Sequence, residues 1–326
     1  MTHRTKVMAT LTYGQCADAQ LLASLCSAGM KGVRINSAHV TPQQLEAMVH
    51  SLRLHAPGVA ILMDTKGPEL RTTVHEHNAD IPLSLNQSVI IRDSDAPSSP
   101  ACISIPGIRP ALREGIELIL DDGEIHLRLT ASDRAIVTKP GLLGERKSVN
   151  LVGCEMPPLP AVSQRDSINL HAAAQLGIDM VAHSFVRSAD DIIQVRAHLA
   201  EAPVRLLAKI ETRLAVQHMD SILDACDGLL MARGDLGTQI SPFAIPAVQR
   251  RCAELCRNAS KSFIIATQIL QSMMHSPEPT RAELSDIALG TWQGADYMLL
   301  CGETARGSFP VECVKVTADT ICCSES

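Results

Sequence analysis

Short apolar runs alternate along the chain with longer stretches in which apolar residues recur at every third or fourth position. The short runs have the length and composition of strands buried on both faces, and the longer stretches have the spacing of helices with one buried face. The runs fall at residues 7–11, 32–36, 59–64, 180–184, 206–210, 229–232, 263–266 and 297–300. Eight strand–helix units close a (β/α)8 barrel, so we predict an α/β fold of the TIM-barrel type. The competing architecture is an open doubly wound sheet, but the chain has no Gly-x-Gly-x-x-Gly turn.

Local signals mark several helix ends. Gly29 follows a helical stretch at 17–28 and suits a left-handed C-terminal cap, and a second helix is expected near 42–54. Ser163 is expected to cap a helix that runs to about residue 176, and Thr280-x-x-Glu283 has the pattern of a capping box. Pro310 suits a first helical turn, and the apolar residues after it form one stripe: Val311, Val314, Ala318, Ile321 and Cys322.

The alternation stops between residues 67 and 160. This segment carries short strand-like runs at 89–92, 101–105, 116–120, 125–129 and 135–137. Asp122-Gly123 provides a tight hairpin turn between two of them. We therefore predict a small all-β domain at 67–160, inserted after the third strand of a barrel domain that comprises 1–66 and 161–326.

Polar residues gather where the predicted strands end. They are Arg34, Asn36, Asp64, Lys209, Glu211, Asp235, Thr267 and Glu303. Because the active sites of TIM barrels lie at the carboxyl ends of the strands, we expect these side chains to converge.

Lys209 and Glu211 stand two positions apart on one predicted strand, so their side chains point to the same side. Asp235 follows the next strand, and the neighbouring Gly234 lets backbone N–H groups approach a bound anion closely. Oxygen ligands from Glu211 and Asp235 suit a divalent metal, with Lys209 beside it facing an anion. For the Lys-x-Glu spacing alone, an ion pair that caps a buried strand is the simpler explanation, and the second segment with Asp235 is what favours a metal site.

A series of motifs resembles the pyruvate kinase family. The strongest are Ala-Lys-Ile-Glu at 208–211 and Met-Ala-Arg-Gly-Asp-Leu-Gly at 231–237. Others occur in the family's order: Met-Asp-Thr-Lys-Gly-Pro-Glu-Leu-Arg at 63–71, Ala-Thr-Gln at 266–268, Pro-Thr-Arg-Ala-Glu at 279–283 and Gly-Glu-Thr-Ala at 302–305. The resemblance covers residues 6 to 322, approximately.

The resemblance implies a site for phosphoryl transfer. Glu211 and Asp235 would hold Mg²⁺ or Mn²⁺, Lys209 would stabilise the phosphoryl group in transfer, and Arg34 would bind phosphate. Backbone groups of Arg233, Gly234 and Asp235 would receive the substrate carboxylate. Thr267 would stand beside the enol carbon, where a proton completes the formation of pyruvate.

The resemblance also implies sites for a monovalent cation and a nucleotide. K⁺ is expected near Asn36, Asp64 and Thr65, and Glu69 fits the cation-dependent subgroup of the family. The expected nucleotide-binding residues are Asn36, His39, Arg71 and Arg165.

Three departures from the family pattern affect these expectations. Ala38 removes one hydroxyl ligand of the monovalent ion, unless Ser37 or water replaces it, so weak K⁺ activation is expected. The loop that seats the nucleotide in the family reads Thr10-Leu11-Thr12-Tyr13-Gly14-Gln15 here and differs from the family's motif, which affects the expected nucleotide affinity. Cys301 replaces a serine that belongs to the proton relay, and a thiol is a poorer hydrogen-bond donor than a hydroxyl.

The function that the resemblance implies is transfer of a phosphoryl group between phosphoenolpyruvate and ADP, giving pyruvate and ATP. The inserted domain corresponds to a lid that closes over nucleotide. The family's usual C-terminal domain, which carries effector sites, is missing from the sequence, so effector regulation of the usual kind is not expected. Two alternatives stay open: a non-catalytic or regulatory protein that binds phosphoenolpyruvate, and a metal-dependent keto-acid lyase or aldolase.

Composition limits the classes of binding partner and the cellular location that we expect. A formal net charge of −6 argues against a nucleic-acid or anionic-membrane surface, and four Phe, two Tyr and one Trp are too few for base stacking. No apolar run is long enough for a membrane span, and the first residues lack a signal-peptide core. We therefore expect a cytoplasmic protein with small-molecule substrates, and a homo-oligomer is left open. The eleven cysteines do not form a disulfide framework by spacing, and Cys252 and Cys256 are expected in the core.

Overall fold

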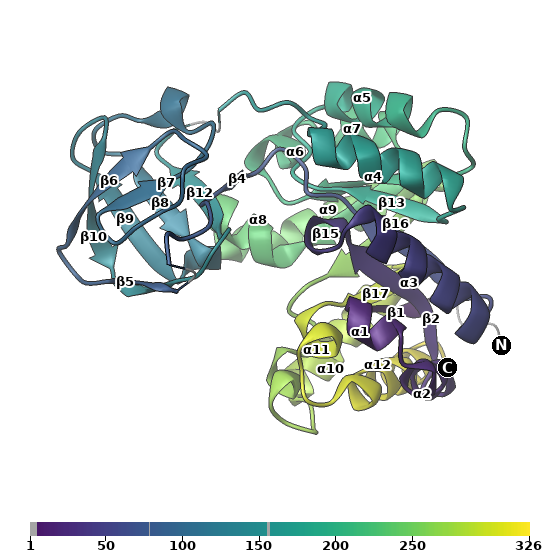
Figure 1. The fold of residues 1–326 in the computed structure, drawn as a ribbon. Coiled ribbons are helices and arrows are strands. Elements are labelled where there is room, and N and C mark those ends of the chain that lie inside the picture. Colours follow the sequence, from purple (N-terminus) through teal and green to yellow (C-terminus); the bar gives the residue numbers. More distant parts are fainter. Residues whose placement is uncertain (1–4, 78, 155–156) are drawn as a thin grey trace. The chain divides into compact units, whose positions relative to one another are not determined.

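Eight parallel strands close into a barrel in the computed structural model, which describes residues 5–77, 79–154 and 157–326 (Figure 1). Their order around the barrel is β1 (Lys6–Thr10), β17 (Tyr297–Leu300), β16 (Ser262–Ala266), β15 (Gly228–Ala232), β14 (Arg205–Ile210), β13 (Met180–His183), β3 (Ala60–Asp64) and β2 (Met30–Asn36). Each strand pairs in parallel with both neighbours, which confirms the predicted TIM barrel.

Helices connect these strands. They are α1 (Tyr13–Cys16), α2 (Ala19–Ser27), α3 (Pro42–His55), α4 (Gln164–Gln175), α5 (Ala189–Leu199), α6 (Arg213–Gln217), α7 (Met219–Ala225), α8 (Arg233–Gln239), α9 (Ile245–Ala259), α10 (Arg281–Trp292), α11 (Gly302–Ala305) and α12 (Pro310–Ser324). In the described ranges, none of the helices combines the length and the apolar character needed to cross a lipid bilayer.

The predicted caps are present. The Ser163 side chain accepts a hydrogen bond from the backbone of Asp166 at the start of α4, and Thr280 forms the full capping box with Glu283 on α10. Gly29 has φ 111°, a conformation that favours glycine, and follows Ala28, the C-cap of α2. One detail was wrong: Cys322 lies on the exposed side of α12, because Cys313 and Thr317 take the buried positions beside Val314.

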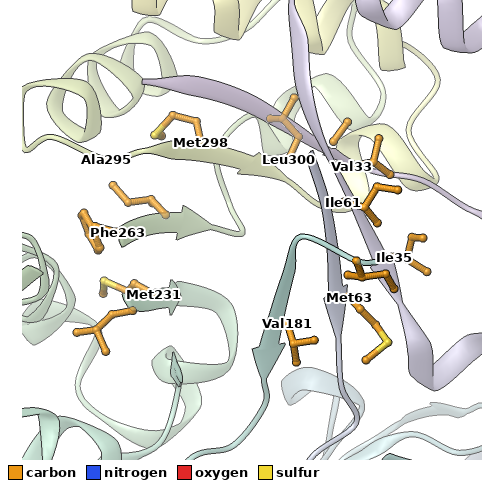
Figure 2. Packing of buried hydrophobic residues seen from close by; sticks show 14 of the residues in the cluster. Val33, Ile35, Ile61, Met63, Val181, Met231, Phe263, Ala295, Met298 and Leu300 are labelled. Carbon is orange, nitrogen blue, oxygen red and sulfur yellow. The ribbon is translucent and has the colours of Figure 1, made fainter. Parts of the chain in front are cut away.

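Side chains on the barrel strands alternate between two buried layers. On β14, Leu206, Ala208 and Ile210 belong to the large cluster between strands and helices, whereas Leu207 belongs to the smaller cluster inside the barrel. Since successive strand residues point to opposite faces, Lys209 lies on the inner face with Leu207. The outer cluster includes Val33 and Ile35 of β2, which are in register with Ile61 and Met63 of β3 (Figure 2).

Three aspartates repeat one arrangement at the amino-terminal ends of the strands. Asp179, Asp227 and Asp296 each precede a strand and accept the backbone N–H of a neighbouring one, from Ile61 (2.7 Å), Leu206 (2.7 Å) and Phe263 (2.9 Å). These bonds satisfy N–H groups where the strand ladder begins. The carboxylates at this end are therefore structural.

The chain divides into two compact units, the barrel unit of Met1–Gly67 and Ala161–Ser326 and a second unit, Pro68–Pro160. Its larger sheet has the order β4 (Leu70–Arg71), β12 (Ser148–Val152), β8 (Glu117–Leu120), β9 (Ile125–Leu129), β10 (Arg134–Lys139), β6 (Ser88–Arg92) and β7 (Cys102–Ser104). A two-stranded sheet pairs β11 (Gly141–Leu143) with β5 (Ile81–Leu83). The unit has its own apolar core, so the expected inserted all-β fold is confirmed.

Four strands of this unit were not predicted from the sequence: β4, β5, β11 and β12. Three of them have only two or three residues, and Pro82 and Gly141 are residues more typical of turns. The expected hairpin after β8 is present, because β8 and β9 pair antiparallel across a short 3-10 turn at Asp121–Gly123.

Candidate active site

A group of charged and polar side chains lies at the carboxyl ends of β2, β3, β13 and β14. Its members are Arg34, Asp64, Ser184, Lys209 and Glu211. Each strand places its contribution on the inner face by the same alternation that separates the two apolar layers. Four of the eight residues predicted from the strand ends thus meet in one place: Arg34, Asp64, Lys209 and Glu211.

Lys209 occupies the centre of this group. Its Nζ donates to Ser184 Oγ at 2.9 Å and lies 3.3 Å from Asp64 Oδ1 and 3.2 Å from Glu211 Oε2. Burial alone would lower the pKa of a lysine, but the charges of Asp64 and Glu211 outweigh burial and raise the pKa of Lys209 above its ordinary value. The ammonium is therefore charged at neutral pH.

Asp64 joins two cations. Arg34 donates from Nε to Asp64 Oδ2 at 2.8 Å, and its Nη2 pairs with the same oxygen. Arg34 Nη1 also donates to Thr10 Oγ1 at 3.2 Å. Burial raises the pKa of Asp64, but the charges of Lys209 and Arg34 outweigh it and hold this pKa below its usual range. Asp64 is thus a fixed negative charge that orients both Lys209 and Arg34.

Glu211 is fully buried and only partly satisfied. Its Oε1 accepts the backbone N–H of Phe185 at 2.6 Å, whereas Oε2 has no hydrogen bond, although it lies 3.2 Å from Lys209 Nζ. Burial raises the pKa of Glu211 to about 8; the charge of Lys209 opposes this rise and that of Asp235 adds to it. An oxygen without a hydrogen bond, near a second carboxylate, is an arrangement that a divalent cation stabilises.

Glu211 and Asp235 therefore fit the predicted metal. Within the part of the chain that the structure describes, no three His, Cys, Asp or Glu side chains are grouped as a metal site on their own. Mg²⁺ is commonly held by one or two carboxylates together with water and substrate oxygens, so two protein carboxylates suffice for it.

Thr267 follows β16 in an unusual backbone conformation. Its φ is 68° and that of Gln268 is 54°, a region that β-branched residues rarely adopt. Thr267 Oγ1 accepts the backbone N–H of Gly234, at the start of α8, at 2.8 Å. The Arg233 side chain is turned toward this segment, where it donates to Thr267 O and pairs with Asp286.

The residues expected around a monovalent cation are close to one another. Asn36 Oδ1 accepts the backbone N–H of Ala38 at 3.1 Å, and the buried Ser37 hydroxyl donates to Asp64 O at 2.8 Å. Thr65 Oγ1 lies 2.9 Å from His183 Nδ1. The Ser37 hydroxyl is therefore engaged with backbone.

Of the residues expected to bind nucleotide, His39 and Arg165 are exposed on the barrel unit, and Arg165 donates to Val40 O at 2.9 Å. Arg71 lies on β4 of the second unit. There it pairs with Glu69 and donates to Arg146 O at 2.8 Å.

Sequence reasoning missed Ser184. This side chain is 3% exposed and joins Lys209 to Asp64, with its Oγ 2.9 Å from Asp64 Oδ1 and 2.7 Å from Thr65 O. The signal was available, because Ser184 ends a predicted strand as the other site residues do. Glu303, by contrast, uses its carboxylate on the backbone N–H groups of Ile269, Leu270 and Cys301.

The fold and these residues define a TIM-barrel protein with a buried charged centre at the carboxyl ends of its strands. Residues 2–314 match the family model "Pyruvate kinase, barrel domain", and the chain belongs to the pyruvate kinase family. It is 37% identical over 332 residues to pyruvate kinase from Geobacillus stearothermophilus, an alignment that covers 97% of this chain and 56% of that protein. It is 33% identical over 337 residues to pyruvate kinase from Schizosaccharomyces pombe, covering 98% of this chain and 66% of that protein. The chain thus spans between about half and two thirds of the length of these relatives.

Proposed function

We propose that this chain transfers a phosphoryl group from phosphoenolpyruvate to ADP and releases pyruvate and ATP. The observation that carries the proposal is the position of Lys209, whose charged Nζ is held by Ser184 between Asp64 and Glu211. Phosphoryl transfer between two anions depends on positioning and on positive charge. Family membership supports the same reaction.

Glu211 and Asp235 are the proposed ligands of Mg²⁺ or Mn²⁺. When bound, the ion would neutralise negative charge on the substrate and on the transferred group. The unsatisfied Oε2 of Glu211 supports this assignment, because a buried carboxylate oxygen with no hydrogen bond is costly to leave alone.

Lys209 and Arg34 are the proposed cationic groups that bind and orient the phosphoryl group. Both contact Asp64, so neither side chain has to be ordered when the substrate arrives. Preorganised charge of this kind avoids reorganisation during the reaction.

Thr267 is the proposed last donor in the path that brings a proton to the enol carbon. Its Oγ1 already accepts a hydrogen bond from Gly234, so its own hydrogen is available to another acceptor. Water must resupply that proton, because a threonine hydroxyl does not ionise near neutral pH. The backbone of Arg233, Gly234 and Asp235 is the proposed contact for the substrate carboxylate.

A monovalent cation at Asn36, Asp64 and Thr65 is also proposed. Nucleotide binding is proposed for Asn36 and His39, and contacts with nucleotide phosphates are proposed for Arg165 and Arg71. These assignments rest on the family's motifs and stay predictions.

A protein that binds phosphoenolpyruvate without turning it over is the second candidate. Cys301 favours it, since burial raises the pKa of this thiol, which therefore stays protonated and is a weak hydrogen-bond donor.

Pyruvate formation from phosphoenolpyruvate and ADP, at saturating Mg²⁺ and K⁺, distinguishes the two. We expect Lys209→Met to lower the rate by at least about a hundredfold, as removal of a preorganised charge at the reacting group does. Lys261→Met is the matched control, because Lys261 donates to the carbonyl of Leu223 and lies next to the start of β16, at the opposite end of the strand from Thr267. If the wild type makes no more pyruvate than Lys209→Met, and calorimetry shows that it binds phosphoenolpyruvate, the non-catalytic alternative is established.

A further inference from the structure

The guanidinium of Arg233 is fully committed within the barrel unit. Nε and Nη2 donate to Thr267 O at 3.2 and 2.9 Å, and Nη2 also donates to Gln268 O at 2.9 Å. Nη1 donates to the two carboxylate oxygens of Asp286, on α10, at 2.9 and 2.7 Å. The Arg233 side chain is 9% exposed. It is therefore turned toward the 267–268 turn and α10 and is not free to bind a substrate.

This turn needs outside support. Thr267 and Gln268 are consecutive non-glycine residues with positive φ, and Thr267 is β-branched. Such a conformation persists when neighbouring structure holds it. Arg233 holds the two carbonyl groups of the turn, and Glu303 accepts the N–H groups of Ile269 and Leu270 that follow it, at 3.3 and 3.1 Å.

The support also determines where the Thr267 hydroxyl lies. Its Oγ1 accepts the N–H of Gly234, the residue after Arg233. Arg233 thus fixes the Thr267 peptide through its side chain, and the next residue fixes the hydroxyl through its backbone. A rotation of the Thr267 backbone would break this bond and redirect the hydroxyl.

We propose that the Arg233–Asp286 pair is a positioning device that holds Thr267 in its left-handed conformation and so directs the hydroxyl for proton delivery. This inference rests on the proposed function. In that step the electrons of the enolate double bond form a C–H bond at the terminal carbon as the C–O bond becomes a carbonyl. The Thr267 hydroxyl passes on the proton and regains one from water. Arg233 and Asp286 act through Thr267 and do not touch the reacting atoms.

The test compares Arg233→Lys and Asp286→Asn with a matched control. A lysine cannot span two carbonyl groups and a carboxylate, whereas an asparagine keeps one acceptor for Arg233. Arg53→Lys is the control, since Arg53 Nη2 donates to Gly177 O at 2.8 Å and to Asp179 Oδ2 at 3.0 Å, at the amino-terminal end of the barrel. Thr267→Val shows how far kcat and methyl exchange fall when the hydroxyl is absent.

ATP and pyruvate are measured separately, together with solvent deuterium exchange into the methyl group of pyruvate. We expect Arg233→Lys to lower kcat and methyl exchange by about ten- to a hundredfold, within the range of general acid catalysis, with a smaller loss for Asp286→Asn. KM for phosphoenolpyruvate should stay within about twofold, because the lost interaction acts after binding. Arg53→Lys should match the wild type.

Two results would overturn the proposal: wild-type kcat in folded Arg233→Lys, or a loss that appears only in KM. If the wild type makes no pyruvate, the proposed reaction fails, and crystal structures of the same variants decide the positioning role. A Thr267 φ that leaves the left-handed region in Asp286→Asn or Arg233→Lys supports it, and an unchanged φ in both refutes it.

Discussion

Ser184 joins the ammonium of Lys209 to the carboxylate of Asp64, and Ser184→Ala tests whether that link matters for the reaction. The change removes the closest hydrogen-bond acceptor of Lys209, at 2.9 Å, while the two neighbouring carboxylates stay at 3.2 and 3.3 Å. The ammonium keeps its charge but loses the bond that fixes its direction. We therefore expect a loss of activity together with a loss of stability.

The magnitude follows from the kind of bond removed. A hydrogen bond to a charged group contributes about 1.5–3 kcal/mol, and each 1.36 kcal/mol corresponds to a tenfold change in rate. We expect Ser184→Ala to lower kcat/KM for phosphoenolpyruvate by about ten- to a hundredfold. The free energy of unfolding should fall by about 1–3 kcal/mol, since the buried groups that contact the Ser184 hydroxyl lose a hydrogen-bond partner.

The assay is steady-state turnover at saturating ADP and Mg²⁺, with urea unfolding of the same preparations. Thr317→Val is the matched control, because the buried Thr317 hydroxyl donates to Cys313 O at 2.8 Å on α12. It should lose similar stability and keep its turnover. Wild-type kcat/KM in folded Ser184→Ala, or an equal loss of activity in both variants, would refute the proposed role of this link.

Three further predictions concern Cys301, the monovalent cation and the reactivity of Cys16. Cys301→Ser should raise pyruvate turnover, because a hydroxyl is a better hydrogen-bond donor than a thiol. Burial raises the pKa of the Cys301 thiol, which therefore stays protonated. An unchanged or lower kcat contradicts this prediction. K⁺ should activate weakly, because Ala38 lacks a hydroxyl and the Ser37 hydroxyl donates to Asp64 O; a strong, saturable K⁺ requirement in a Na⁺/K⁺ titration contradicts this. Burial raises the pKa of Cys16 to about 12, so at pH 8 this thiol stays protonated and should react with a thiol reagent only after unfolding. The exposed Cys322 should react in the native state, and mass spectrometry of the labelled chain separates the two.

Periodicity alone was enough to predict the barrel and to group four side chains of the candidate site: Arg34, Asp64, Lys209 and Glu211. Strand residues alternate between faces whatever the rest of the fold, so the spacing of Lys209 and Glu211 already placed them on one side of β14. Parallel strands also end together, which brought Arg34 and Asp64 into the same prediction. The contacts of Lys209 with Asp64 and Glu211 agree with that reasoning.

Contacts between distant segments could not be derived in this way. The bond from Lys209 to Ser184 and the pair of Arg233 with Asp286 each join elements far apart in the chain, and no local spacing relates their partners. The conformation of Thr267 even opposes its local preference, because a β-branched residue avoids positive φ.

The amino-acid sequence by itself thus determined which residues form strands and which side chains share a face, since these depend on short-range geometry. The tertiary structure decided which of those side chains meet, which acceptors they use and which backbone strain is tolerated. Those outcomes depend on closing the barrel, where burial makes each unsatisfied polar group costly and so selects its partner.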